Sequence, residues 1–356
     1  MSKKIRVLVV DDSAFMRKSI SYILESSGEI EIVGTAKNGL EGFEAVMKFK
    51  PDLVTLDVEM PVMNGLETLK KIMDECPTPV IMLSSLTAEG TETTLKALSL
   101  GAVDFLTKDV VNLNSGLINI QKELIAKIKS IHNQRSLTFR LSRINNRLSE
   151  PSERKAVQPT SNFVRPAFEI KAILIGISTG GPLSLQKVIP ELNKNIPVPI
   201  FIVQHMPPMF TKSLAERLNK MSPIAVKEAE DREHIVPSQV YIGQGGKHMI
   251  AEKNSGLYHI KISDHPADSL YKPCVDVTLN SLIDYYGKHV FAIIMTGMGK
   301  DGFEAVKRLK KIGGYSVAQD EDSCVVFGMP KALVDNKLAD AILPLDSIAT
   351  QINKLF

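Results

Sequence analysis

Three residues whose side chains could together hydrolyse an ester or an amide occur in short segments of the C-terminal half of the chain. Ser178 lies in GISTGGP (176–182), His205 in QHMP (204–207) and Asp301 in TGMGKDG (296–302). A serine hydroxyl becomes a good nucleophile when a base takes its proton, an imidazole can do so near neutral pH, and a carboxylate can hold the resulting imidazolium. Each segment follows an apolar run typical of a buried strand, so we expect the three side chains at one edge of a parallel sheet.

Each of these residues also has a purely structural interpretation. The glycine-rich turn around Ser178 could cradle a phosphate at a helix N-terminus, or the serine could be an N-cap. His205 could be a core histidine and Asp301 a helix cap. GxSxG alone is only suggestive. The hydrolytic interpretation is favoured because it gives all three residues one task, and because Gly297 and Gly299 would let backbone N–H groups approach an oxyanion.

The remaining histidines of this half lie in no comparable setting, and no metal-ligand spacing emerges. We therefore expect surface or turn positions for His234, His248, His259, His265 and His289.

Carboxylates follow two predicted strands in the N-terminal half. Asp11 and Asp12 come after Arg6–Val10, and Asp57 comes after Leu53–Leu56. In a doubly wound sheet of order 2-1-3-4-5 these strands are neighbours, and ligands bind beyond their carboxyl ends. Three converging carboxylates would repel one another without a cation, and their oxygens favour magnesium.

Two further polar side chains are predicted at the same edge. Ser84, or with less support Ser85, ends the fourth strand, and Lys108 ends the fifth. A hydroxyl and an ammonium there would suit a phosphoryl group on Asp57. Singly, Asp12 and Ser13 could cap a helix and Lys108 could close a turn, but the convergence of all these groups favours the phosphoryl site.

Two successive α/β patterns must position these groups, and both predict doubly wound sheets. The predicted strands are Arg6–Val10, Ile30–Thr35, Leu53–Leu56, Val80–Leu83, Val103–Leu106, Ala172–Ile177, Pro199–Val203, Val240–Ile242, Val290–Met295 and Tyr315–Ala318. Apolar residues with helical period predict two helices with buried stripes, one formed by Phe15, Ile20, Ile23 and Leu24 and the other by Leu40, Phe43, Val46 and Met47. Further helices are predicted at 117–131, 183–192, 211–220 and 303–312. Residues 249–262 predict a hairpin with its turn at 254–256.

A basic, polar segment separates the two patterns. Arginine and lysine alternate there with Ser, Asn and Pro, which predicts a linker at 130–168 between domains at 1–129 and 169–356. A patch for phosphate or an acidic partner is possible, but a solvated connector is favoured.

Composition agrees with this organisation. The length of 356 residues suits about two domains, and 44% hydrophobic residues exclude wholesale disorder. A net charge of +3 is too small for a chain that coats nucleic acid. Three isolated cysteines indicate neither a disulfide framework nor a zinc cluster. The apolar runs are too short for a secretory signal or a membrane helix, so we expect a cytoplasmic protein without membrane insertion.

The acidic and basic groups of the N-terminal half resemble those of receiver domains of two-component response regulators, which have a flavodoxin-like fold. By that resemblance Asp57 would accept phosphate from a histidine kinase, and Asp11 and Asp12 would hold magnesium together with it. Ser84 and Lys108 would sense the phosphoryl oxygens. Phe105 would take the aromatic switch position.

GISTGG, QHMP and TGMGKDG behind such a receiver and a linker resemble the chemotaxis protein-glutamate methylesterases (CheB) along essentially the whole chain. The resemblance implies a triad of Ser178, His205 and Asp301, with Thr179 beside the nucleophile and the Met298 N–H in the oxyanion hole. Ile177 departs from the family, which usually has a smaller alanine there, and the basic linker looks longer than usual.

The function so implied is a phosphorylation-activated hydrolase of glutamate γ-methyl esters on chemoreceptors, which would also deamidate receptor glutamines. The esterase reaction would need no cofactor, and the receiver would cover the site until it is phosphorylated. A rival hypothesis is a response regulator that binds a nucleotide or nucleic acid at the glycine-rich turn. It leaves His205 and Asp301 without a shared task, and no helix-turn-helix pattern supports it.

Overall fold

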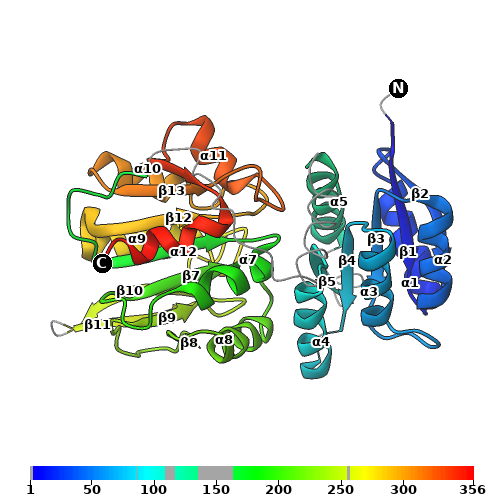
Figure 1. Cartoon of the computed structure of the whole chain (residues 1–356), viewed down its shortest axis with the longest axis horizontal. Coiled ribbons are helices and arrows are strands. Elements are labelled where there is room, and N and C mark those ends of the chain that lie inside the picture. Colours follow the sequence, from blue (N-terminus) through cyan, green and yellow to red (C-terminus); the bar gives the residue numbers. More distant parts are fainter. Residues whose placement is uncertain (1–2, 86, 109–116, 135–162, 255–256) are drawn as a thin grey trace. The chain divides into compact units, whose positions relative to one another are not determined.

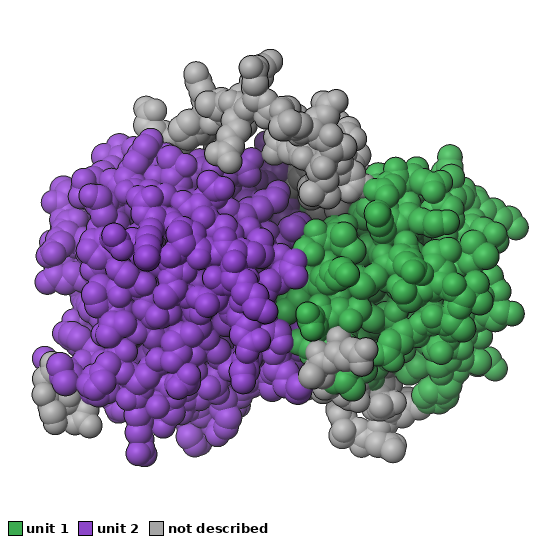
Figure 2. Space-filling view, turned by 60° about the horizontal axis from the view of Figure 1, so that its bottom comes forward, with its two compact units in different colours: residues 1–155 green, residues 156–356 purple. Residues whose placement is uncertain are grey.

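The computed structural model describes residues 3–85, 87–108, 117–134, 163–254 and 257–356. The chain divides into two compact units, residues 1–155 and 156–356, which Figure 2 shows in green and purple. Within the described ranges, no helix has both the length and the apolar run that crossing a bilayer requires. Most of the predicted linker, 135–162, lies outside the described residues.

Unit 1 is a five-stranded parallel sheet of order β2-β1-β3-β4-β5, as predicted. Its strands are β1 (Ile5–Val10), β2 (Ile30–Ala36), β3 (Leu53–Asp57), β4 (Val80–Ser84) and β5 (Asp104–Thr107), and its helices are α1 (Ala14–Glu25), α2 (Gly39–Phe49), α3 (Gly65–Glu75), α4 (Ala88–Ser99) and α5 (Leu117–Asn133). Helices α1 and α5 pack together, and α2, α3 and α4 pack in sequence along the other face (Figure 1). This topology is the doubly wound one expected from the sequence.

The predicted helix stripes are only partly correct. Phe15 of α1 is 54% exposed, and Leu40 and Met47 of α2 are also exposed. In α2 the buried face runs through Gly42 and Val46, because the Cα of Gly42 lies against the Val10 side chain, where a Cβ would come within 2.8 Å of it. A glycine carries no hydrophobic signal, so the sequence pattern missed this close helix-to-sheet contact.

Unit 2 contains a seven-stranded parallel sheet of order β14-β13-β12-β6-β7-β9-β8 and a separate antiparallel hairpin, β10-β11. Its strands are β6 (Ala172–Ile177), β7 (Ile200–Gln204), β8 (Ala225–Glu228), β9 (Gln239–Ile242), β10 (His248–Asn254), β11 (Leu257–Ser263), β12 (Val290–Ile294), β13 (Tyr315–Gln319) and β14 (Ala341–Leu343). Its helices are α7 (Gly181–Val188), η2 (Ile189–Glu191), α8 (Phe210–Met221), α9 (Val275–Tyr286), η3 (Gly287–His289), α10 (Phe303–Lys311), α11 (Met329–Asp335) and α12 (Leu345–Asn353).

Helices cover both faces of this sheet. The α9, α10 and α11 helices share one hydrophobic core with the strands, and α7, α8 and α12 pack near one another (Figure 1). The hairpin packs on α9. The predicted strands and hairpin are confirmed, although residues 255–256 of its turn lie outside the described residues. The sequence reading missed β8, β14, α9, α11 and α12.

Residues 163–168, predicted to be linker, pack on unit 2. The Phe163 ring contacts the rings of Phe291 and Tyr315 edge-on, with centroids 6.4 and 6.1 Å away. The Tyr315 hydroxyl donates a hydrogen bond to the Val164 carbonyl at 2.7 Å. This segment therefore contributes to the packing of unit 2.

Candidate active site

Ser178 lies in the sharp turn between β6 and α7, at the carboxyl edge of the sheet. Its backbone N–H donates to the Thr296 carbonyl at 2.9 Å, and its carbonyl accepts from the Gly181 N–H at 2.8 Å. Gly180 closes the turn with a φ of +78°, and a Cβ there would lie 2.4 Å from the Val325 side chain. Only glycine meets both conditions without strain. The turn leaves Ser178 half-buried at the surface.

His205 follows β7 and contacts Asp301, which lies 96 positions further along the chain. The His205 Nε2 atom is 2.8 Å from Asp301 Oδ2, and both side chains are more than nine-tenths buried. The His205 backbone N–H donates to the Ile177 carbonyl at 3.2 Å, so the imidazole is carried directly beside the turn that holds Ser178. Its second nitrogen, Nδ1, is buried and has no hydrogen-bond partner among the described residues.

The Asp301 carboxylate lies at the N-terminus of α9. Oδ2 also accepts from the Val275 N–H at 2.7 Å, and Oδ1 accepts from the Asp276 N–H at 3.0 Å and from the Cys274 thiol at 3.2 Å. Burial alone would raise the pKa of Asp301, but the hydrogen bond and charge of His205 and the backbone N–H groups lower it to about 2. The carboxylate is thus charged, as an acid that orients a histidine must be.

The charged carboxylate affects two neighbours at the start of α9, the N-cap residue Cys274 and Asp276. Burial and then the negative charge of Asp301 raise the pKa of Cys274 to about 12, so its sulfur stays protonated and donates. Burial, with Asp301 as a further cause, raises the pKa of Asp276 to about 6, although its Oδ1 accepts from the Ala305 N–H at 2.7 Å.

Two contacts hold together the turns that carry Ser178, His205 and Asp301. The buried Gln204 side chain donates through Nε2 to the Ser178 carbonyl at 3.0 Å and to the His205 carbonyl at 3.2 Å. A Cβ at Gly297 would lie 2.8 Å from the Ser178 Cβ, so the turn after β12 abuts the Ser178 turn. The serine, histidine and carboxylate predicted from separate motifs are therefore brought to one place on three adjacent strands, β12, β6 and β7.

The two residues predicted beside the nucleophile lie in the same turns. Thr179 is buried, and its carbonyl accepts from the Thr296 hydroxyl at 2.9 Å. Met298 is half-buried, and its backbone N–H has no acceptor among the described residues, whereas the Gly297 N–H donates to Val326. The Met298 N–H is thus available to an oxyanion.

The sequence reading missed Tyr271, Cys274 and Gln204. The Tyr271 ring stacks on the His205 ring, with centroids 4.2 Å apart and planes 12° from parallel. Gln204 stood in the QHMP motif, so its polar side chain at the end of a buried strand was an available signal. Tyr271 and Cys274 carried none, because they approach the site only through the loop before α9.

In unit 1, the predicted acidic edge forms. Asp11, Asp12 and Asp57 each offer an oxygen, and these oxygens lie within 4.8 Å of one another. The Lys108 ammonium is 2.6 Å from Asp57 Oδ2 and 3.3 Å from Asp11 Oδ2. The Ser13 N–H donates to Asp11 Oδ1 at 2.8 Å, and the Ser13 hydroxyl caps α1.

The electrostatics of this edge fit a divalent cation. Burial, followed by repulsion from Asp11, raises the pKa of Asp57 to about 6, even though the contact with Lys108 lowers it. The contact with Asp57 raises the pKa of Lys108 despite its burial. Clustered, partly buried carboxylates of this kind are the oxygen ligands that magnesium prefers.

Ser84, predicted to sense the phosphoryl oxygens, and Phe105, predicted at the aromatic switch position, are both buried. The Ser84 hydroxyl donates to the Gly90 carbonyl at 3.2 Å and accepts from the Thr94 hydroxyl at 2.6 Å, so it faces α4. Phe105 of β5 is 6% exposed. The hydrogen bonds of the Ser84 hydroxyl do not include the Asp57 carboxylate, so a role for Ser84 in sensing a phosphoryl group would require its hydroxyl to turn.

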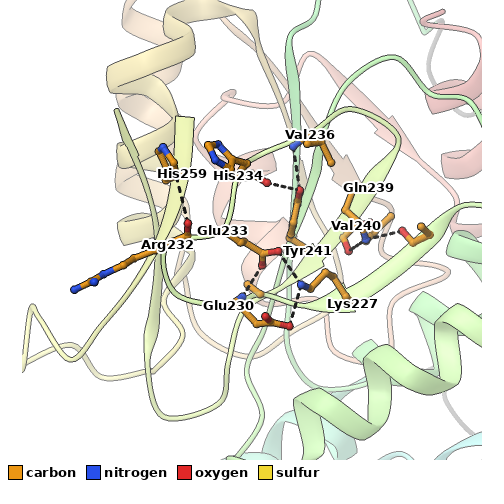
Figure 3. A network of polar contacts seen from close by, with 12 residues as sticks. Lys227, Glu230, Arg232, Glu233, His234, Val236, Gln239, Val240, Tyr241 and His259 are labelled. Atoms are coloured by element: carbon orange, nitrogen blue, oxygen red, sulfur yellow. Dashed lines mark hydrogen bonds and ion pairs between the residues drawn. The ribbon is translucent and has the colours of Figure 1, made fainter. Parts of the chain in front are cut away.

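The expectation for the other histidines was wrong for one. His248 begins β10 and is fully buried, with Nε2 3.0 Å from the Pro266 carbonyl, and burial lowers its pKa. His234 and His259 form a cross-strand pair outside the site (Figure 3). In the same network the Tyr241 hydroxyl accepts from Val236 and donates to the His234 carbonyl. This network holds the segment before β9 on the sheet.

Comparison with known proteins matches both units. Residues 173–352 match the family profile of the CheB methylesterase, and residues 7–115 match that of the response regulator receiver domain. A protein-glutamate methylesterase/protein-glutamine glutaminase of Lawsonia intracellularis is 46% identical, with 98% of both chains covered. One of Thermotoga maritima is 43% identical, with 99% of this chain and 98% of that chain covered.

A solved structure is also similar to unit 2. The crystal structure of the Thermotoga maritima CheB methylesterase catalytic domain is 43% identical to this chain, with a TM-score of 0.51. The alignment covers 53% of this chain and all of that one.

Proposed function

The chain belongs to the CheB family of protein-glutamate methylesterases with a receiver domain, and from that membership we propose that it hydrolyses glutamate γ-methyl esters on chemoreceptors with Ser178, His205 and Asp301. Hydrolysis of a receptor glutamine by the same residues, with ammonia in place of methanol as the leaving group, would account for a glutaminase activity. The 2.8 Å contact between His205 Nε2 and Asp301 Oδ2, directly beside the Ser178 turn, is the observation that carries this mechanism.

The two nitrogens of the His205 imidazole exchange the roles that they have in the Ser-His-Asp template, where the acid binds Nδ1 and the serine faces Nε2. Here Asp301 occupies Nε2, which leaves the buried Nδ1 as the base. Nδ1 takes the Ser178 proton as Oγ attacks the ester carbonyl, and the Met298 N–H donates to the oxyanion. Methanol then leaves with the proton from Nδ1, and a water molecule, deprotonated by Nδ1, releases the carboxylate and restores the serine.

Asp301 contributes without reacting. Its charge stabilises the imidazolium during both proton transfers, and its hydrogen bond requires that Nε2 carry the proton in the resting state. The reaction needs no cofactor, because the base, the nucleophile and the oxyanion donor are all groups of this chain.

Labelling with a fluorophosphonate, combined with turnover of methylated receptor, tests the assignment. The reagent should attach to Ser178 in the native chain and not in Ser178→Ala, which should also lose turnover. Ser222→Ala is a matched control, because its hydroxyl is buried and without a partner among the described residues but lies at the end of α8. Labelling that persists in folded Ser178→Ala would refute the assignment, and stabilisation by a nucleotide without labelling would favour the rival binding function.

The receiver would regulate the hydrolase through Asp57. A histidine kinase would supply the phosphoryl group, and Asp11, Asp12 and Asp57 would hold Mg²⁺, whose charge helps to neutralise the phosphoryl oxygens. Lys108, already paired with Asp57, would turn its ammonium to the new phosphoryl oxygens, and Ser84 and Phe105 would follow. In the unphosphorylated chain the receiver would cover the hydrolase site. Phosphorylation would shift the population toward the state in which the site is uncovered, and so activate the enzyme. A cytoplasmic location suits access to the kinase and to receptor helices.

A further inference from the structure

The Tyr271 ring stacks on His205, a contact that the proposed mechanism leaves unused. The two rings lie face to face, with centroids 4.2 Å apart and an interplanar angle of 12°. Tyr271 is half-buried, whereas the imidazole beneath it is 7% exposed. The tyrosine comes from the loop between β11 and α9, so it approaches the histidine from a part of the chain that carries none of the three reacting residues.

This loop is held in place beside the site. The carbonyl of Lys272, next to Tyr271, accepts from the Gly246 N–H at 3.0 Å, and Cys274 lies against Asp301. The Tyr271 hydroxyl lies 3.6 Å from the position that a Cβ would take at Gly299. The ring thus extends from the His205 imidazole to the turn that carries the Met298 N–H.

The stacked ring and the carboxylate restrict different motions of the imidazole. Rotation about the Cβ–Cγ bond would tilt the imidazole edge into the tyrosine ring, so the stack fixes the plane of the imidazole. The plane alone does not decide which nitrogen points where, because a half-turn preserves it. Asp301 decides this by holding a nitrogen at 2.8 Å. Together the two contacts determine the direction of the Nδ1 lone pair.

We propose that Tyr271 is a positioning residue, which uses its ring face to hold the His205 imidazole so that Nδ1 points at Ser178. The inference rests on the proposed function, because it assigns Nδ1 as the base. The face of the ring is the active part, so an aromatic replacement without the hydroxyl should serve equally well. Misplacement of a catalytic group by about 1 Å can cost about 100-fold in rate.

Kinetics of three variants of the full-length chain test the proposal. Tyr271→Phe should keep kcat within about threefold of the native value, whereas Tyr271→Leu should lower kcat roughly 10- to 100-fold with little change in KM for methylated receptor. Tyr258→Leu is the matched control, because that ring packs on Tyr286 away from the site, with centroids 5.2 Å apart. If the leucine variant does not fold, Tyr271→Met replaces it, since methionine fills similar space without an aromatic face.

Nitrogen NMR of ¹⁵N-histidine-labelled protein supplies a readout that a general packing defect would not change. In the native chain and in Tyr271→Phe, the His205 signals should report a proton on Nε2 and none on Nδ1. In Tyr271→Leu the imidazole can tilt out of the plane in which its Nε2–H group meets Asp301, so these signals should broaden and shift from their native positions. A leucine variant with native kcat, or one that is impaired while its His205 signals stay native, would overturn the proposal.

His205→Gln separates this inference from the proposed function. If that variant is inactive and Tyr271→Leu is fully active, only the role of Tyr271 is wrong. If His205→Gln retains native turnover, the mechanism itself fails.

Discussion

Replacement of Asp301 by asparagine should reduce both stability and turnover, and the structure sets the size of the first effect. Four donors converge on this carboxylate, from His205, Val275, Asp276 and Cys274. Burial raises the pKa of Asp301, but the hydrogen bond and charge of His205 and the N–H groups of Val275 and Asp276 lower it from 3.8 to about 2. At about 1.4 kcal/mol per pKa unit, the charged form stabilises the fold by about 2 kcal/mol. An amide presents its NH₂ group to some of these donors, which adds about 1–3 kcal/mol for buried donors left unpaired.

The sign of the pH dependence follows from the lowered pKa. The stabilisation is fully present above the pKa of the unfolded chain, near 3.8, and is lost as pH falls through that value toward about 2. The difference in unfolding free energy between the native chain and Asp301→Asn should therefore shrink as pH falls below about 4. Carboxylates away from Asp301 titrate alike in both proteins and cancel in this difference, whereas Asp276, whose pKa Asp301 helps to raise to about 6, adds a smaller change between about pH 4 and pH 7.

Urea unfolding followed by far-UV circular dichroism measures this difference, because the chain contains no tryptophan. Asp284→Asn is the matched control: Asp284 forms an exposed ion pair with Arg308, so its loss should change stability by less than about 0.5 kcal/mol. Turnover of methylated receptor by Asp301→Asn should fall by about 10²- to 10⁴-fold, less than in Ser178→Ala. Native turnover by Asp301→Asn, or a stability difference that does not change with pH, would refute the reasoning.

Four further predictions concern the nucleophile and the receiver. Ser178→Ala should fold normally and lose turnover by several orders of magnitude, and near-native turnover by the folded variant would exclude the triad. A fragment that starts just before Phe163 should hydrolyse methylated receptor faster than the unphosphorylated whole chain, because the tether gives the receiver a high effective concentration for docking on the hydrolase. The Asp57→Asn variant should stay at the basal rate when a phosphodonor is added. A fragment no faster than the whole chain would indicate that the receiver recruits substrate. Because the pKa of Asp57 is raised to about 6, protons should compete with Mg²⁺ for its carboxylate. The Mg²⁺ affinity measured by calorimetry should therefore weaken from about pH 7.5 to about pH 5.5. An affinity independent of pH would contradict this expectation.

The sequence alone was sufficient to predict the strands that carry the candidate site. Buried parallel strands are nearly continuous apolar runs. Their carboxyl ends coincide with the change from apolar to polar residues at Ser178, His205 and Asp57. Helix α9 was missed because its β-branched residues Val275 and Val277 and its neighbouring aromatic residues suit a strand equally well. The N-terminal amides that hold Asp301 were therefore missed with it.

Other properties of the site depend on tertiary contacts that no local pattern records. The choice of Nε2 over Nδ1 at Asp301 depends on how β7 and β12 present the two side chains across the sheet edge. The stack of Tyr271 on His205 joins two loops 66 positions apart in the sequence. The Ser84 hydroxyl faces α4 because Thr94 and Gly90 offer it partners there, a competition that strand propensity cannot reveal.

The three strands that carry the candidate triad, β12, β6 and β7, are the middle of a seven-stranded sheet with two strands beyond them on either side. Local unfolding of a sheet begins where pairing is least complete, at its edges. Opening of the three-residue β14 or the four-residue β8 would therefore leave the strands of the site paired with each other. In hydrogen exchange these edge strands should lose protection first, while β6 exchanges only when unit 2 unfolds as a whole. The active geometry thus belongs to the last part of the sheet to open, so thermal inactivation should coincide with global unfolding of this unit.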